Sequence, residues 1–194
     1  MKKWLIGMIA LSFVVLTGCS SDPDGFTRDH SYDVEPFQWT NQHGETVSNE
    51  DLKGRVWLAQ FIFTNCTTVC LPMMANMTSL QDRLEEEGLD YTIVSFSVDP
   101  EYDTPDVLSR YIEGYAPSAP EKWQLLTGYE QDEIADFAVD SFKALVIDDP
   151  NSDQVIHGTS FYLVNEEGVV VKTYPGASDV PVEEIVQDMT ALTK

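Results

Sequence analysis

An apolar run that ends just before two closely spaced cysteines constrains this chain most. The run Val56–Phe63 is rich in β-branched and aromatic residues and has no charge, which is typical of a buried strand. The segment after it is typical of a helix start. There Cys66 and Cys70 stand four residues apart, so they share a helical face with Cβ atoms about 5–6 Å apart. Two sulfurs held in this way can close a disulfide or bind one soft metal ion.

Turn and cap signals divide the rest of the chain into short strands and helices. Strands alternate with helices and then two adjacent strands pair, which predicts an α/β protein with a central mixed sheet flanked by helices. This order resembles the thioredoxin fold with an extra N-terminal β-hairpin. We expect a hairpin around residues 41–44, strand 56–63, helix 68–86, strand 91–98, helix 104–113, strand 123–126, helix 130–139, a hairpin of 161–164 with 169–173, and helix 182–192.

The charge balance limits the class of partner. The chain has 194 residues, which is enough for one domain with its own core, and 11 basic against 33 acidic residues give a net charge of −22. Nucleic acid is excluded as an expected partner because phosphate binding needs clustered Lys and Arg.

The N-terminus is typical of a targeting segment. Lys2 and Lys3 precede the apolar stretch Trp4–Leu16, which is too short to span a membrane and ends in Leu-Thr-Gly-Cys at Cys19. This pattern resembles a bacterial lipoprotein signal, with cleavage before a lipidated Cys19. The alternative is an uncleaved anchor helix, and either reading places the folded part at the cell membrane, on the extracytoplasmic side. We therefore expect a signal peptide over residues 1–18, a flexible tether over 19–34 and one domain over 35–194.

If Cys19 carries lipid, Cys66 and Cys70 remain as a pair. A structural disulfide is the common use of a lone pair outside the cytoplasm, but a bridge across so short a loop would stabilise the fold little. The pair also follows a core strand directly, where α/β sheets place their sites. A helix start favours thiolates, which are ligands that suit Cu(I), whereas Cu(II) also prefers nitrogen.

Three histidines could supply that nitrogen. His30 lies in the expected tether and His43 at a turn tip, so both are interpreted as solvated surface residues. His157 stands just before the apolar strand 161–164, and in a thioredoxin-like sheet the loop that enters this strand faces the cysteine loop. His157 is therefore the expected third ligand, although a lone histidine is often only structural.

Three separated motifs resemble the Sco/SenC family and follow its order. They are FIFTNCTTVC followed by a nearby Pro-Met-Met, SVDPEYDTPDVLSRY, and HGTSFYLVNEEG. The resemblance covers roughly residues 37–174. It implies a membrane-tethered, thioredoxin-fold copper protein that assists the binuclear CuA site of cytochrome c oxidase, with a CuA-bearing oxidase subunit as partner. It also implies that the protein binds copper, as Cu(I) or Cu(II), and that the ligands are Cys66, Cys70 and His157.

Other positions near these motifs have open roles. Asp99 falls on an acidic position of the family. There it either contacts and orients the metal ligands without binding the metal itself, or caps the turn that follows. Leu71 stands where the family often has Pro, and Pro72 follows it, which is expected to move the helix start by one residue. Met73, Met74 and Met77 are interpreted as core residues rather than copper ligands.

Two enzymatic alternatives compete with a copper chaperone. A thiol–disulfide oxidoreductase would use Cys66 and Cys70 as its catalytic redox pair. Redox domains of this fold mostly carry C-x-x-C, however, and usually have Pro just before the facing strand, where this chain has Gly158-Thr159-Ser160. A peroxidase would need an Arg beside one reactive Cys, and the nearest basic residue in sequence is Arg83, far along the helix.

Overall fold

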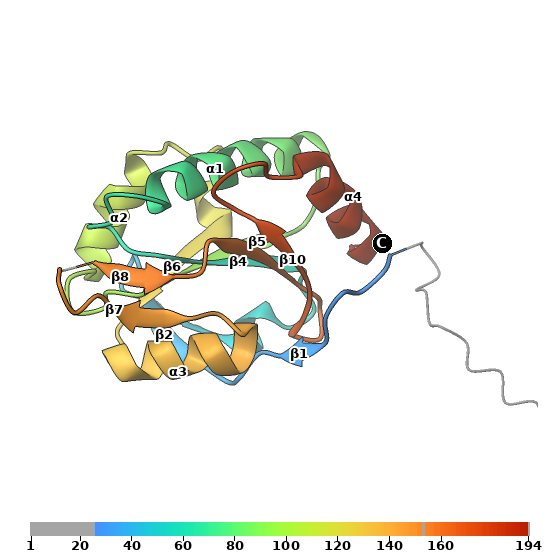
Figure 1. The fold of residues 1–194 in the computed structure, drawn as a ribbon. Coiled ribbons are helices and arrows are strands. Elements are labelled where there is room, and N and C mark those ends of the chain that lie inside the picture. The colour runs from blue at the N-terminus through green and yellow to red at the C-terminus, as the bar shows by residue number, and fades with distance from the viewer. Residues whose placement is uncertain (1–25, 153, 194) are drawn as a thin grey trace, which may run out of the picture.

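The computed structural model describes residues 26–152 and 154–193. The predicted signal peptide, Cys19 and the first part of the predicted tether lie outside these residues. In the described part, a mixed sheet carries helices on both faces (Figure 1). The predicted α/β class is confirmed. Within residues 26–152 and 154–193, no helix combines the length and the hydropathy that crossing a membrane requires.

The main sheet has eight strands in the order β1-β10-β9-β4-β5-β6-β2-β3. The pairs β4–β5 and β5–β6 are parallel, and the other neighbours are antiparallel. β2 and β3 form the predicted N-terminal hairpin. The strands are β1 Tyr32–Asp33, β2 Gln38–Asn41, β3 Thr46–Ser48, β4 Trp57–Ile62, β5 Thr92–Ser97, β6 Trp123–Thr127, β9 Ser160–Val164 and β10 Val169–Pro175.

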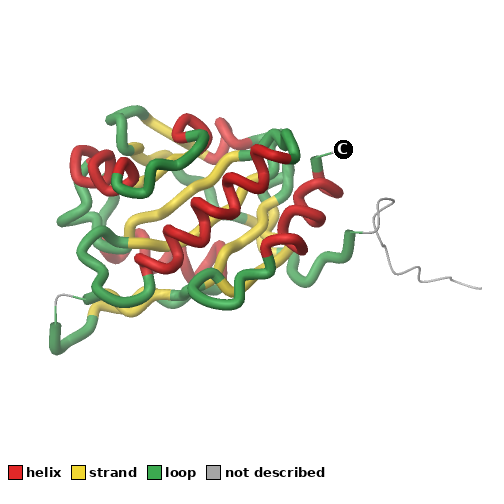
Figure 2. The backbone as a smooth tube through the Cα atoms, turned by 90° about the horizontal axis from the view of Figure 1, so that it is seen from above, coloured by secondary structure: helices red, strands yellow, loops and turns green. Residues whose placement is uncertain are grey.

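The helices form two layers around the sheet. Helices α1 (Cys70–Glu86), α2 (Pro105–Glu113) and α4 (Val182–Leu192) cover one face, and α3 (Gln131–Phe142) covers the other. Figure 2 shows α1 lying across the sheet with α4 beside it. Two short 3-10 turns, η1 (Asn49–Leu52) and η2 (Pro120–Lys122), precede β4 and β6.

Different side chains fill the two core layers. Under α1, the side chains of Met73, Met74 and Met77 are fully buried, which confirms their interpretation as core residues. On the α3 side, aromatic rings pack around Phe96, mostly edge to face. β4 lies between these layers, and all six of its residues are buried. The central strand therefore matches the prediction from its apolar run.

Some element boundaries differ from the prediction by a few residues. α1 begins at Cys70 rather than near residue 68, which puts Pro72 in the first turn, where a missing N–H costs nothing. α3 runs on to Phe142 and ends where Lys143 adopts a left-handed conformation with φ of 55°.

The sequence analysis did not predict a two-stranded ribbon that the structure contains. It consists of β7 (Val146–Asp148) and β8 (Val155–His157), which pair antiparallel apart from the main sheet. Both strands are only three residues long, too short for a periodic signal. The ribbon is important for the site because His157 is its last residue. The sequence analysis had placed His157 in a loop.

The predicted tether over residues 19–34 requires a correction. Residues 26–34, which we call the N-terminal strap, lie on the domain. Phe26 is 3% exposed, Asp29 and His30 both donate backbone N–H groups to the carbonyl of Val171, and β1 pairs with β10. His30 also stacks on Tyr32. The strap was interpreted as tether because it is polar, but one aromatic anchor and backbone pairing with an edge strand hold it.

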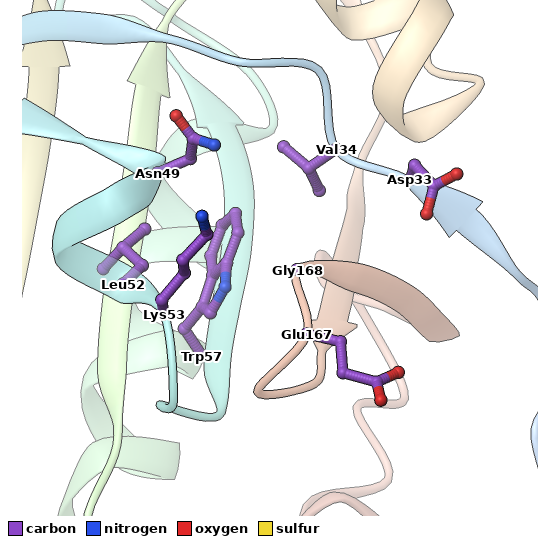
Figure 3. A pocket seen from close by; sticks show the side chains of 8 residues that line it. All are labelled: Asp33, Val34, Asn49, Leu52, Lys53, Trp57, Glu167 and Gly168. Carbon is purple, nitrogen blue, oxygen red and sulfur yellow. The ribbon is translucent and has the colours of Figure 1, made fainter.

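The strap closes over one end of the sheet. There Val34 lies opposite Trp57 at the start of β4 and Leu52 of η1, across a small cavity of about 160 Å³ that Asp33 also lines (Figure 3). The β9–β10 turn, with Glu167 and Gly168, completes the lining. The cysteines follow β4 at its other end, so this cavity is separate from them.

The buried contacts of the strap predict that it contributes to the free energy of unfolding. Phe26→Ala should lower the free energy of unfolding by about 3 kcal/mol, because it removes a buried ring from the core. Thr27→Ala, at an exposed neighbour, should change it by less than about 0.5 kcal/mol. Chemical denaturation of the two variants measures both values. Equal stabilities would mean that residues 26–34 are a free tether, as the sequence suggested.

Candidate metal centre

The two cysteines lie at the carboxyl end of β4. The cysteine loop, residues 63–69, joins β4 to α1 and carries Cys66, whereas Cys70 is the first residue of α1. Cys66 is 8% exposed, Cys70 is fully buried, and both are free thiols. The carboxyl edge of parallel strands is where α/β sheets place their sites, as the sequence analysis expected.

His157 reaches the cysteines from a distant part of the chain. Its Nε2 lies 3.4 Å from the Sγ atom of Cys70, although the two residues are 87 positions apart. Its Nδ1 lies 2.9 Å from the carbonyl oxygen of Gly158, to which it donates a hydrogen bond. This bond leaves the lone pair of Nε2 free to face the sulfurs, the arrangement that a metal-binding histidine needs.

The three side chains form a compact donor set. One ligand atom from each of Cys66, Cys70 and His157 lies within 4.8 Å of the other two. Small side-chain rotations would let one ion with bonds of about 2.0–2.3 Å contact all three. Two sulfurs and an imidazole nitrogen suit copper and also suit zinc, so the chemistry alone selects a soft or borderline metal.

The two thiols differ in acidity. The pKa of Cys66 is lowered, chiefly by a hydrogen bond from the Cys70 thiol and further by nearby backbone groups, against the effect of burial. The pKa of Cys70 is raised, because its proton is held by Cys66 and its side chain is buried. Cys66 is therefore the thiolate of the pair at neutral pH, and Cys70 keeps the shared proton.

The start of α1 stabilises that thiolate. The helix has no side-chain N-cap oxygen, and the N–H of Cys70 donates to Cys66 Sγ at 3.4 Å. The first N–H groups of a helix lack internal partners, and the helix dipole adds partial positive charge there. A sulfur thus takes the place of a capping oxygen, which favours its charged form.

A buried carboxylate that the sequence analysis missed holds the first part of the cysteine loop. Asp103 is fully buried and accepts hydrogen bonds from the backbone N–H and the hydroxyl of Thr64 and from the hydroxyl of Ser97. Burial raises its pKa, whereas these hydrogen bonds oppose the rise. Asp103 belongs to the same SVDPEYDTP motif as Asp99, and the threonine that follows it resembled a helix cap, which drew attention away from it.

Asp99 lies in the turn after β5. Its backbone carbonyl accepts from the N–H groups of Tyr102 and Asp103, and its own N–H donates to Ser97 Oγ. Its carboxylate lines a groove of about 630 Å³ with Glu101 and Asp148, and burial together with these charges raises its pKa. A hydrogen bond from the backbone N–H of Tyr102 to this carboxylate opposes the rise, and both roles considered for Asp99 stay predictions.

Other residues that the sequence analysis weighed lie away from the centre. His43 is exposed at its turn tip. Arg83 lies almost four turns along α1, about 20 Å from Cys70, and pairs with Glu86 and Glu183. Arg83 is therefore too far away to serve as the arginine beside the thiolate of a peroxidase site. Cys19 lies outside the described residues.

Comparison with known proteins identifies the relatives of the chain. A family model described as SCO1/SenC matches residues 27–194. The chain is 52% identical over 188 residues to the SCO1 protein homolog of Bacillus subtilis, covering 96% of each sequence.

Solved structures agree with that match. A SCO1/SenC family lipoprotein from Bacillus anthracis is similar with a TM-score of 0.83 and 47% identity, covering 87% of this chain and 100% of that one. BsSco, a member of the Sco family of cytochrome c oxidase assembly proteins, has a TM-score of 0.79 and 49% identity over 87% and 97% of the chains. ScoI of Bradyrhizobium japonicum with copper bound has a TM-score of 0.69 and 25% identity over 83% and 99%. These likenesses confirm the thioredoxin-like fold.

The asymmetry of the thiols predicts a pH profile. The alkylation rate of Cys66 by iodoacetamide in the reduced, metal-free protein should change less than about threefold between pH 7.5 and 5.5, because Cys66 stays ionised. A thiol with an ordinary pKa of about 8.5 would slow about 100-fold. Peptide mapping by mass spectrometry separates Cys66 from Cys19 and from the unreactive Cys70. A 100-fold decrease at Cys66 would contradict the assignment.

The anchoring role of Asp103 predicts a stability difference. Asp103→Ala should lower the free energy of unfolding by about 2–4 kcal/mol, because it leaves the donors of Thr64 and Ser97 buried without an acceptor. Asp99→Ala, in the same turn, should cost less than about 1 kcal/mol. Urea denaturation of both variants checks this, and equal losses would mean that the buried carboxylate has no special role.

Proposed function

Because the chain belongs to the SCO1/SenC family, we propose that it is a membrane-tethered copper-binding protein that delivers copper to, or prepares the thiols of, the CuA site of cytochrome c oxidase. The observation that carries the proposal is the convergence of Cys66, Cys70 and His157 within 4.8 Å. The copper-bound ScoI and the oxidase-assembly role of BsSco support the choice of metal and process. Copper is the cargo of this site, and the partner is the oxidase subunit that bears CuA.

The arrangement of the ligands suggests an order for copper transfer. Cys66 lies in a loop whose neighbours Asn65 and Thr67 are exposed, whereas Cys70 is fully buried at the helix start. An incoming thiolate from the partner would therefore displace Cys66 first and Cys70 last. Exchange of one ligand at a time avoids release of the bare ion, and each cysteine regains a hydrogen-bond partner in the pair.

The membrane tether is part of the proposal. A lipidated Cys19 after removal of residues 1–18 would anchor the domain on the extracytoplasmic side, and the Bacillus anthracis relative is a lipoprotein. Since the strap begins at Phe26, the free tether would span only residues 20–25, about 20 Å at full extension. Figures 1 and 2 show the described chain beginning at the end of the domain away from the β7–β8 ribbon. The metal centre would thus face away from the anchor.

A second function rests on the thiol pair itself. Cys66 is a thiolate beside a second thiol, so it could attack a partner disulfide and release one partner thiolate. Cys70, once deprotonated, would attack the mixed disulfide and release the second partner thiolate, leaving Cys66 and Cys70 as a disulfide. Burial of Cys70, which also raises its pKa, would remain in the mixed disulfide and would slow this second step. Reduction of an oxidised CuA domain by the copper-free protein would support thiol–disulfide oxidoreductase activity.

The ligand set predicts different losses for the two copper ions. His157→Ala should weaken Cu(II) binding at least about tenfold more than Cu(I) binding, because two thiolates hold Cu(I) whereas Cu(II) needs the imidazole. A competition titration measures both affinities, and the thiolate-to-Cu(II) absorption band should disappear in the variant.

Three control variants accompany this titration. His43→Ala changes an exposed histidine and should bind both ions as the unmodified protein does. Cys66→Ser and Cys70→Ser should abolish tight copper binding but keep a cooperative unfolding transition. Equal losses of Cu(I) and Cu(II) in His157→Ala, or no loss, would remove His157 from the ligand set.

A further inference from the structure

We propose that Gln154 is a positioning residue that holds the His157 ribbon against the cysteine loop, an inference that rests on the proposed copper site. The Gln154 Nε2 donates to the carbonyl oxygen of Asn65 at 3.1 Å. Its Oε1 accepts from the backbone N–H and the hydroxyl of Thr67, both at 3.3 Å. One carboxamide therefore binds the residues on both sides of Cys66.

The place of Gln154 in the ribbon gives these bonds their importance. Gln154 directly precedes β8, the strand that ends in His157. Within the described residues, Gln154 makes three hydrogen bonds to the cysteine loop. His157 itself contacts Cys70 at the start of α1. Gln154 thus links the segment of the third ligand to the segment of the first.

The ribbon is also held by a hydrogen bond of 3.3 Å from Gln131 of α3 to Asp148 of β7, but this bond does not involve the cysteine loop. Its inner face packs through Val146 and Val155 against the aromatic core, while Ile147 and Ile156 on its outer face are 47% and 55% exposed. Apolar contacts are non-directional, so they tolerate sliding of a short ribbon. Hydrogen bonds to a carbonyl and an N–H from one planar amide are directional and fix the register.

The cysteine loop is then held from two sides. Asp103 binds Thr64 from the β5 side, and Gln154 binds Asn65 and Thr67 from the ribbon side. Loss of Asp103 would disturb the loop and the core together. Loss of Gln154 would free the ribbon and its imidazole but leave the two sulfurs in place. Gln154 should therefore affect Cu(II), which needs the imidazole, much more than Cu(I).

The test compares Gln154→Met with Asn151→Ala in the full chain. Methionine keeps the length of the side chain and removes its hydrogen bonds, whereas Asn151 lies in the same ribbon turn and bonds only to Asp149 among the described residues. Gln154→Met should bind Cu(II) about tenfold more weakly, with Cu(I) affinity changed less than about twofold and the Cu(II) electron paramagnetic resonance signal altered. Asn151→Ala should leave all three unchanged.

An experiment without metal tests the hydrogen bonds of Gln154 to the cysteine loop by themselves. In the copper-free protein, amide hydrogen exchange at Thr67 should accelerate about tenfold in Gln154→Met. It should stay near the original rate in Gln154→Glu, whose carboxylate still accepts from that N–H. An unchanged exchange rate at Thr67 in Gln154→Met would overturn the proposed positioning role of Gln154, whether or not copper binds.

Two copper results would also overturn the proposal. One is Cu(II) affinity in Gln154→Met equal to that of Asn151→Ala, and the other is equal loss of both copper ions. Failure of the proposed copper site itself has a separate signature, because His157→Ala would then leave Cu(II) affinity unchanged while the exchange result at Thr67 still stands.

Discussion

A buried carboxylate, Asp103, stabilises the loop on which the metal centre depends. The loop leaves the fully buried strand β4 and must turn into α1 without a regular backbone partner. The N–H and hydroxyl of Thr64 satisfy their hydrogen-bonding needs on Asp103, which also binds Ser97 at the end of β5. This network joins the carboxyl ends of two parallel strands. It allows the loop to carry Cys66 in a conformation that neither strand nor helix would give, next to Cys70 at the start of α1.

The centre divides its ligands between a local and a distant segment. Cys66 and Cys70 are close because they belong to one strand-to-helix junction, and their thiols share a proton so that Cys66 is the thiolate. His157 arrives on a separate ribbon, and its Nδ1 bond to Gly158 orients the ring. Such a division would suit the proposed copper transfer, because movement of the ribbon would weaken one ligand without opening the core.

The N-terminal strap changes the expected relation between domain and membrane. Phe26 and the β1–β10 pairing hold residues 26–34 on the sheet, so little chain is left between Cys19 and the folded part. If Cys19 is lipidated as proposed, so short a connection would raise the effective concentration of the domain near a membrane-bound partner. It would also limit the partner surfaces that the metal centre reaches.

The sequence by itself determined the elements whose signals are local. The apolar run 56–63, the helix ending before Gly88 and the hairpin around residues 165–168 are all found where periodicity and turn residues predicted them. The cysteine pair could also be read from the sequence, because i and i+4 spacing at a helix start is a local property. The donor set was identified by residue type, since few histidines were available.

Only the tertiary structure decided how these parts meet. The strap, the ribbon and the roles of Asp103 and Gln154 depend on hydrogen bonds between residues far apart in the chain, and such pairings leave no periodic trace in short polar segments. Asp99 and Asp103 look alike in sequence, and burial alone separates a turn residue from an anchor of the site. Local sequence sets which conformations a segment prefers, whereas the energy of a polar side chain depends on the groups that folding brings to it.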